Sequence, residues 1–287
     1  MKTTWVNSGS AADNSDNSDN SESAENINRT NTNMTTSTNM TTSTKMNQTS
    51  QIDTQVLKDK LPEELQRALA TLSSRVKHVF ITGAGGFLGS TICRFLLSSG
   101  IKVTGFSRGN YPELTQLGID MIQGDIADLP ALTQAMKGCD LVFHVAAKAG
   151  VWGTKDQFFK PNVDGAKNIL NACNTLGIER LVYTSTPSVT FAGEDENAVD
   201  ESQPYAGNYL NYYAHSKAIA EQLVLAASNI THNDIHHGNV LKTVALRPHL
   251  IWGPNDPHLV PRVLERAKAG RLKLVGKTDK LVDTIYI

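Results

Sequence analysis

The sequence predicts an α/β fold, in which a doubly wound parallel sheet carries helices on both faces. Short apolar segments rich in β-branched residues alternate with longer helical segments from residue 76 onward. A glycine-rich turn joins the first strand pattern of this region to the first helix pattern. The length of 287 residues suffices for one large domain or two small ones. Strands and helices that alternate in this way form parallel sheets with right-handed crossovers.

Each expected strand is a short apolar run, and each expected helix is a longer segment between two such runs. The strands are expected at 78–82, 102–106, 120–123, 140–145, 180–185, 243–247 and 281–287. The helices are expected at 90–99, 165–176, 213–227 and 260–269. The sequence stops inside the last strand, where a sheet domain rarely ends without cover. We therefore expect a truncated C-terminal substrate region that starts at about residue 250.

The first 75 residues differ in composition from the rest. Asp-Asn-Ser occurs three times within 13–21, and Asn-Met-Thr-Thr-Ser-Thr occurs in tandem at 33–38 and 39–44. Such polar repeats bury too little apolar surface to offset the entropy of ordering, so 1–50 is expected to be a disordered tail. Leucines at helical spacing predict a helix at 53–74, within a helical linker at 51–75. The alternative is that this helix docks on a partner or on the domain expected at 76–287.

Charge and cysteine content narrow the function classes. Lys and Arg number 27, Asp and Glu 28, and the net charge of −1 is not that of a nucleic-acid-binding protein. Cys93, Cys139 and Cys173 form no CxxC pair and are expected to be small core residues in a reducing compartment. No run of 18 apolar residues predicts a transmembrane helix, and no apolar segment after Lys2 predicts a secretion signal. A cytoplasmic location is expected.

Gly83, Gly86 and Gly89 form a GxxGxxG pattern between the first strand and the helix that follows it. One glycine permits the tight turn, a second lets the backbone approach a pyrophosphate, and the third lets the helix pack closely against the strand. The helix N-terminus offers free N–H groups and a partial positive charge to the phosphates. In this context the pattern predicts a dinucleotide site in a Rossmann-type fold.

Tyr213 and Lys217 lie one helical turn apart, about 130 residues after the glycine turn. A free phenol has a pKa of about 10, and a nearby ammonium is expected to lower it by roughly 3 units so that it acts as acid or base near neutrality. Lys217 is also expected to hydrogen-bond the nicotinamide ribose. Tyr212 is five residues from Lys217 and faces it less well. With the glycine turn, this pair predicts an enzyme that uses a nicotinamide cofactor to move a hydride at a carbonyl or alcohol carbon.

The end of the second strand distinguishes the two nicotinamide dinucleotides. NAD sites usually place a carboxylate there for the ribose 2′-OH, whereas this chain has Ser107 followed by Arg108. Because arginine can hold a 2′-phosphate through two hydrogen bonds, NADP(H) is preferred and NAD(H) is the alternative. After the third strand, Asp125 is placed to meet the adenine amino group, or it only stabilises a turn. Its neighbour Ile126 is expected at the same site.

Several hydroxyls end the fifth strand, at the sheet edge where such sites lie. One of them is expected to orient the oxygen of the substrate. Thr186 is the first choice and Ser185 the second, and the alternative is that these side chains only cap the loop.

Six motifs resemble the extended short-chain dehydrogenase/reductase superfamily and, within it, the 3β-hydroxysteroid dehydrogenase branch. They are the glycine turn, His144-Val145-Ala146-Ala147, Asn162-Val163-Asp164-Gly165, Tyr183-Thr184-Ser185-Thr186, Tyr213-Ala214-His215-Ser216-Lys217 and Leu246-Arg247-Pro248, and the resemblance covers about 77–287. It implies that Thr186 takes the active-site Ser/Thr position and that Asn162 has a structural or proton-relay role. The residues expected to contact the cofactor, in line with this resemblance, are Phe87, Leu88, Ile126, Ala146, Ala147, Lys148, Lys217 and Pro248.

Segments 146–153, 183–190 and 251–258 are similar to the reductases of the bacterial long-chain olefin pathway. This resemblance implies NADPH-dependent reduction of a 2-alkyl-3-keto acid, with Lys148 and Trp152 near substrate or cofactor. It also implies a thiolase-like condensing enzyme and a β-lactone synthetase as partners, and relatives often form homodimers. The tail, the long segment 228–242 and the early end depart from the family pattern. Losing the C-terminal cover should forfeit about 25 cal/mol per Å² of apolar contact with an alkyl chain.

Other functions remain as alternatives. A steroid or sterol 3β-hydroxy dehydrogenase belongs to the same branch, and a nucleotide-sugar epimerase or dehydratase would be expected to carry a carboxylate in place of Ser107. A dinucleotide-sensing binding protein would be expected to lose the Tyr/Lys pair. The segment 228–242 also holds His232, Asp234, His236 and His237, but its loop-forming neighbours argue against a metal site and the expected chemistry needs no metal.

Overall fold

The central feature of the protein is a six-stranded parallel sheet. The computed structural model describes residues 61–228, 240–273 and 282–287. The strands are β1 (His78–Thr82), β2 (Lys102–Ser107), β3 (Asp120–Gln123), β4 (Leu141–His144), β5 (Arg180–Thr184) and β6 (Lys242–Leu246). Their order is β3-β2-β1-β4-β5-β6, and all neighbouring pairs are parallel. This is the order of a doubly wound sheet, so the expected fold class is confirmed.

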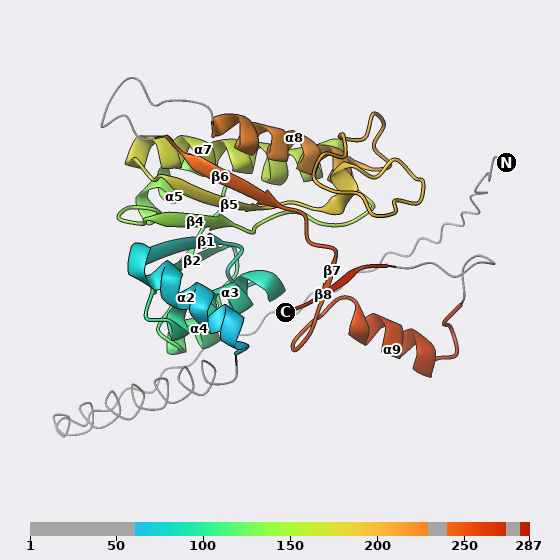
Figure 1. Cartoon of the computed structure of the whole chain (residues 1–287), viewed down its shortest axis with the longest axis horizontal. Coiled ribbons are helices and arrows are strands. Elements are labelled where there is room, and N and C mark those ends of the chain that lie inside the picture. Colours follow the sequence, from blue (N-terminus) through green and yellow to red (C-terminus); the bar gives the residue numbers. More distant parts are fainter. Residues whose placement is uncertain (1–60, 229–239, 274–281) are drawn as a thin grey trace, which may run out of the picture. The chain divides into compact units, whose positions relative to one another are not determined.

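Helices cover both faces of this sheet (Figure 1). One face carries α2 (Glu63–Arg75), α3 (Phe87–Ser98) and α4 (Pro112–Gln116). The other carries α5 (Leu129–Ala135), α7 (Gly165–Leu176) and α8 (Tyr212–Ala227). The chain enters α7 through α6 (Lys155–Phe159) and a π-helical turn, η1 (Lys160–Asp164), and a short 3₁₀ turn, η2 (Pro187–Val189), follows β5.

Each face has its own apolar core. Beneath α3, the buried side chains of Val79, Ile81 and Leu96 belong to one cluster. Beneath α7 and α8, Phe80, Ile169 and Val224 belong to the other. Successive strand residues point to opposite faces, so Phe80 lies in one cluster and its two neighbours in the other. The central strands β1, β2 and β4 are therefore covered on both sides, whereas the edge strands β3 and β6 are not fully buried.

The helix expected before the sheet docks on the folded domain. In α2, Leu69 belongs to the buried cluster beneath α3, and Leu65 and Leu72 pack against this cluster, as does Leu61 just before the helix. Of the alternatives left open by the sequence, the structure supports docking for the part of this helix that it describes. The tail at 1–50 and the first residues of the expected linker lie outside the described residues.

Strand and helix positions agree closely with the patterns in the sequence, and the differences are local. β1, β3 and α7 have the expected bounds, and α3 begins three residues before the expected start because the glycine turn leads directly into it. The sequence patterns missed α4, α5, α6 and both short turns.

The chain after β6 forms a separate two-stranded parallel sheet. Its strands are β7 (Leu250–Trp252) and β8 (Thr284–Tyr286), and α9 (Val260–Lys268) lies between them in sequence. The strand expected at 281–287 is thus present but shorter, and β7 was missed. Within the ranges that the structure describes, no helix is both long and apolar enough to span a bilayer. The histidines of 229–239 lie outside those ranges.

Candidate active site

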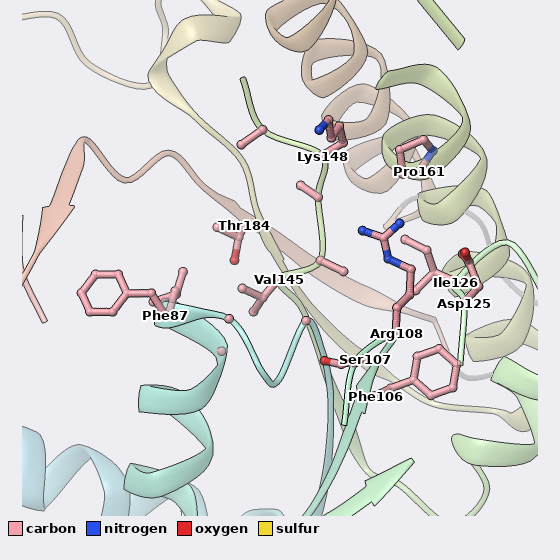
Figure 2. Close-up of a pocket in the computed structure, with 18 of the residues that line it drawn as sticks. Phe87, Phe106, Ser107, Arg108, Asp125, Ile126, Val145, Lys148, Pro161 and Thr184 are labelled. Carbon is pink, nitrogen blue, oxygen red and sulfur yellow. The ribbon is translucent and has the colours of Figure 1, made fainter. Parts of the chain in front are cut away.

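A cavity of about 1230 Å³ opens at the carboxyl ends of the central strands. Its volume exceeds the ~300–1,000 Å³ of ordinary small-molecule sites, which leaves room for a dinucleotide and a substrate. Most of the residues expected at the site line this cavity (Figure 2). They are Gly83, Gly86, Phe87, Leu88, Gly89, Ser107, Arg108, Asp125, Ile126, Ala146, Ala147, Lys148, Ser185, Tyr213 and Lys217.

The glycine turn has the geometry of a phosphate cradle. Gly83 has φ +69°, and a Cβ on Gly89 would lie 2.2 Å from the Gly83 carbonyl oxygen, so neither position accepts a side chain. A Cβ on Gly86 would lie 3.2 Å from the same oxygen, a tight contact that also favours glycine at this position. No side chain caps the N-terminus of α3, which leaves its first N–H groups free for an anion. These residues fit the pyrophosphate of a dinucleotide.

A fourth glycine has a different role, which sequence reasoning missed. A Cβ on Gly85 would lie 2.1 Å from the Tyr111 ring, and Tyr111 also lines the cavity. The Gly85 N–H donates a hydrogen bond to the Ser107 hydroxyl oxygen at 3.0 Å. Gly85 therefore lets the loop after β2 close over the glycine turn. Because these partners lie more than 20 residues apart in the chain, no local pattern indicated the contact.

The residues that were expected to select the dinucleotide lie together at the end of β2. Ser107 is largely buried, while Arg108 is exposed and extends into the space that Asp125, Ile126 and Lys148 also border (Figure 2). Within the described part of the chain, the Arg108 guanidinium forms no ion pair. Asp125 accepts a hydrogen bond from the Ala127 N–H at 2.9 Å, so it stabilises a turn as well as lining the cavity.

Asn162 joins three segments around the site. It lies in η1 and is 1% exposed. Its side-chain oxygen accepts from the Lys148 N–H at 2.7 Å, and its amide group donates to the Lys148 carbonyl at 3.1 Å and to the Ser216 hydroxyl at 2.9 Å. These bonds tie the loop after β4 to α8. They support the structural alternative for Asn162.

Tyr213 lies in the first turn of α8, where Asn211 caps the helix by accepting from the Ala214 N–H at 2.9 Å. Burial raises the pKa of Tyr213 above its ordinary value, and a hydrogen bond with the Thr186 side chain offsets only part of that shift. The expectation that Lys217 lowers this pKa is therefore wrong for this geometry. A protonated phenol is suited to donate a proton rather than to accept one.

Lys217 is directed toward the end of β5 and is 2% exposed. Its ammonium donates to the Thr184 carbonyl at 2.6 Å and lies 4.1 Å from the centre of the Tyr183 ring. Burial lowers the pKa of Lys217 to about 7, although Glu221 raises it in part. A buried lysine with these partners stabilises the negative charge of Tyr213 less than the sequence spacing suggested.

Residues 80–287 match the model of the 3-beta hydroxysteroid dehydrogenase/isomerase family. The chain belongs to this family. It is 61% identical over 235 residues to the 2-alkyl-3-oxoalkanoate reductase of Shewanella oneidensis, an alignment that covers 82% of this chain and 60% of the other. It is also 33% identical to the human sterol-4-alpha-carboxylate 3-dehydrogenase, decarboxylating, over 81% of this chain and 61% of that one. The chain thus spans about three fifths of the length of the relatives it matches.

Solved structures of sugar-nucleotide enzymes have a fold similar to that of this chain. The UDP-glucose 4-epimerase of Thermus thermophilus, solved with NAD, has a TM-score of 0.60 and 28% identity, and the match covers 73% of this chain and 70% of that one. MoeE5, solved with UDP-glucose and NAD, has a TM-score of 0.62 and 28% identity over 73% of this chain and 67% of that one.

Not every residue expected from the family resemblance lies on the cavity wall. Thr186 and Asn162 are buried behind it and reach the site through Tyr213 and Lys148. Pro248 does not line the cavity, and Trp152 is 90% exposed and does not line it either. The Ser185 hydroxyl is bonded to the carboxylate of Glu221, a buried residue that the sequence did not single out.

Proposed function

We propose that this chain carries the cofactor site and the catalytic residues of an NADP-dependent 2-alkyl-3-oxoalkanoate reductase, which converts a 3-keto group into a 3-hydroxyl group. The main support is one observation: the glycine turn and the Tyr213–Lys217 pair line the same cavity. Relatives with that name are 61% and 49% identical to the chain, which is the support for the substrate class.

The proposed roles follow from the contacts of each side chain. When bound, the dinucleotide supplies the hydride that reduces the carbonyl carbon. Tyr213 donates its proton to the carbonyl oxygen, and its raised pKa keeps it protonated near neutrality. Thr186, whose side chain is hydrogen-bonded to Tyr213, orients the carbonyl oxygen of the substrate. Ser185 is less suited to that role, because its hydroxyl donates a hydrogen bond to Glu221. Lys217 holds the ribose hydroxyls.

A bound dinucleotide would be held by backbone at its central pyrophosphate and by residues of other loops at its two ends. The first turn of α3, with Phe87, Leu88 and Gly89, takes the pyrophosphate. Asp125 and Ile126 border the adenine, and Ala146, Ala147 and Lys148 from the loop after β4 border the nicotinamide end. Pro248 stays a candidate contact at that end.

Arg108→Ala is expected to weaken NADPH binding roughly 10- to 100-fold and to change NADH binding much less. A hydrogen bond to a charged phosphate contributes ~1.5–3 kcal/mol, and NADH lacks the 2′-phosphate. The two affinities are measured by titrating NADPH or NADH with the protein and following the fluorescence of the cofactor. Arg67→Ala, at an exposed position on α2, is the matched control. Equal losses for the two cofactors would contradict the preference for NADP(H).

The substrate class is tested by following NADPH absorbance. A 2-alkyl-3-keto acid is expected to be reduced with a higher kcat/KM than a 3-ketosteroid, because two relatives at 61% and 49% identity are named for the keto acid. A preference for the steroid would instead favour a sterol 3β-hydroxy dehydrogenase, the second candidate, which the human relative supports.

The remaining alternatives have weaker support. A nucleotide-sugar epimerase is favoured by the solved structures at 28% identity, but the side chain at the end of β2 is a serine rather than a carboxylate. A cytoplasmic location fits three free, buried cysteines. A condensing enzyme and a β-lactone synthetase as partners, and a homodimer, follow only from the proposed pathway and are part of the proposal.

A further inference from the structure

Glu221 is a buried carboxylate to which the proposed mechanism gives no role. It lies one helical turn after Lys217 on α8 and is 1% exposed. One oxygen accepts from the Arg247 Nε at 3.0 Å, from its Nη2 at 2.6 Å and from the Tyr205 hydroxyl at 3.0 Å. The other oxygen accepts from the Ser185 hydroxyl. A buried charge with this many donors is held in one position.

The donors come from three segments around the active site. Ser185 follows β5, Arg247 follows β6, and Tyr205 precedes α8. Ser185 stands between Thr184, whose carbonyl binds Lys217, and Thr186, which is bonded to Tyr213. The carboxylate therefore fixes the strand end on which both members of the Tyr/Lys pair depend.

Lys217 and Glu221 are both buried, yet they form no direct ion pair in the described part of the chain. A buried ammonium needs a compensating charge or strong acceptors to stay protonated. Burial lowers the pKa of Lys217, and among the neighbouring groups Glu221 raises it. Burial, and to a lesser extent the Lys217 charge, lowers the pKa of His144, which lies beside Tyr183 on the sheet.

Besides Tyr183 and His144, further ionisable groups line the cavity that Lys217 also lines. They are Tyr213 on the same helix, Lys148, Asp156 and Lys160 from the β4–α7 connection, Arg108, Tyr111 and Asp125 from the turns after β2 and β3, and His258. Among these groups, only Asp125 and Asp156 carry a negative charge that could compensate the Lys217 ammonium in place of Glu221. Both are exposed, whereas Glu221 is buried.

We propose that Glu221 is a positioning residue of the proposed reductase, acting as the internal counter-charge of Lys217 and, through Ser185, as the anchor of the strand end that Lys217 binds. The proposal rests on the proposed function for its role in reduction. Its physical content, the dependence of Lys217 on Glu221, is independent of any substrate.

The test is the titration of Lys217 in the full chain without added cofactor. The protein is labelled with ¹³C at lysine Cε, and the Lys217 signal is assigned by its loss in Lys217→Arg. In Glu221→Gln the midpoint is expected to fall by about one pH unit, because removing a nearby anion makes the ammonium less stable. Tyr205→Phe removes one hydrogen bond to the same oxygen and keeps the charge, so its midpoint is expected to match the wild type.

A midpoint that stays at the wild-type value in Glu221→Gln would overturn the proposal and leave Glu221 a purely structural group. If that variant does not fold, the double variant Glu221→Gln/Arg247→Met removes the ion pair without leaving an unpaired buried charge. Its Lys217 midpoint is expected to lie below that of Arg247→Met, the matched variant that keeps the Glu221 charge, and equal midpoints in these two variants would overturn the proposal.

NADPH binding separates this proposal from the proposed function. Cofactor binding that needs the ammonium is present below the Lys217 midpoint and is lost as pH rises through it. The loss is expected at lower pH in Glu221→Gln than in the wild type, whereas a structural defect would weaken binding equally at every pH. A wild type that titrates as expected but binds no nicotinamide cofactor would reject the proposed function and leave the Lys217–Glu221 coupling established.

Discussion

Tyr213→Phe is expected to lower kcat for ketone reduction about 10²- to 10⁴-fold, the usual contribution of a positioned general acid. Phenylalanine keeps the ring that packs 6.4 Å from the Phe158 ring and removes the hydroxyl that is bonded to Thr186. NADPH affinity is expected to stay near the wild-type value, because the substitution leaves the glycine turn and Lys217 unchanged. Steady-state rates of NADPH oxidation and a fluorescence titration measure the two effects.

The neighbouring tyrosine supplies a matched control. Tyr212 begins α8 and is 46% exposed, so Tyr212→Phe removes a phenol of the same helix that is far more accessible to solvent. Its kcat is expected to equal that of the wild type. Equal rates for wild type and Tyr213→Phe would reject Tyr213 as the acid, and a loss only in Tyr212→Phe would move the role to that residue.

The fold and the cofactor site were readable from the sequence because their signals are local. The glycine turn needs three small residues at fixed spacing, and the central strands β1, β2 and β4 are short apolar runs buried on both faces. The bounds of β1, β3 and α7 follow from such runs and from hydrophobic periodicity. The π-helical turn at 160–164 was missed because three of its five residues, Pro161, Asn162 and Asp164, are typical of loops.

The chemistry of the catalytic pair could not be read in the same way. One-turn spacing places Tyr213 near Lys217, but the pKa of each depends on burial and on which acceptors the ammonium reaches. Those acceptors, the Thr184 carbonyl and the Tyr183 ring, lie more than 30 residues away in sequence. Glu221 gave no signal either, because a glutamate on a helix is most often a solvated residue.

Arg247→Met is expected to lower the free energy of unfolding by about 3–5 kcal/mol, because it leaves the Glu221 carboxylate buried without its counter-ion. The Arg247 side chain is 22% exposed and that of Glu221 is 1% exposed, so the carboxylate itself has almost no contact with water that could replace the guanidinium. Urea denaturation followed by circular dichroism measures the change. Arg67→Met breaks a pair whose side chains are 74% and 90% exposed, and it is expected to cost about 0–1 kcal/mol.

The double variant Glu221→Gln/Arg247→Met decides whether the unpaired charge causes the loss. A neutral glutamine can accept from the Tyr205 hydroxyl through its oxygen and donate to the Ser185 hydroxyl oxygen through its amide nitrogen, so the double variant is expected to recover at least half of the stability that Arg247→Met loses. A double variant as unstable as the sum of the two single variants would show that packing, and not charge, makes Arg247 necessary. If the double variant regains stability but binds NADPH more weakly than the wild type, the two roles of Glu221 are distinct. The fold then requires only that no unpaired charge is buried at position 221, whereas Lys217 requires the negative charge of Glu221.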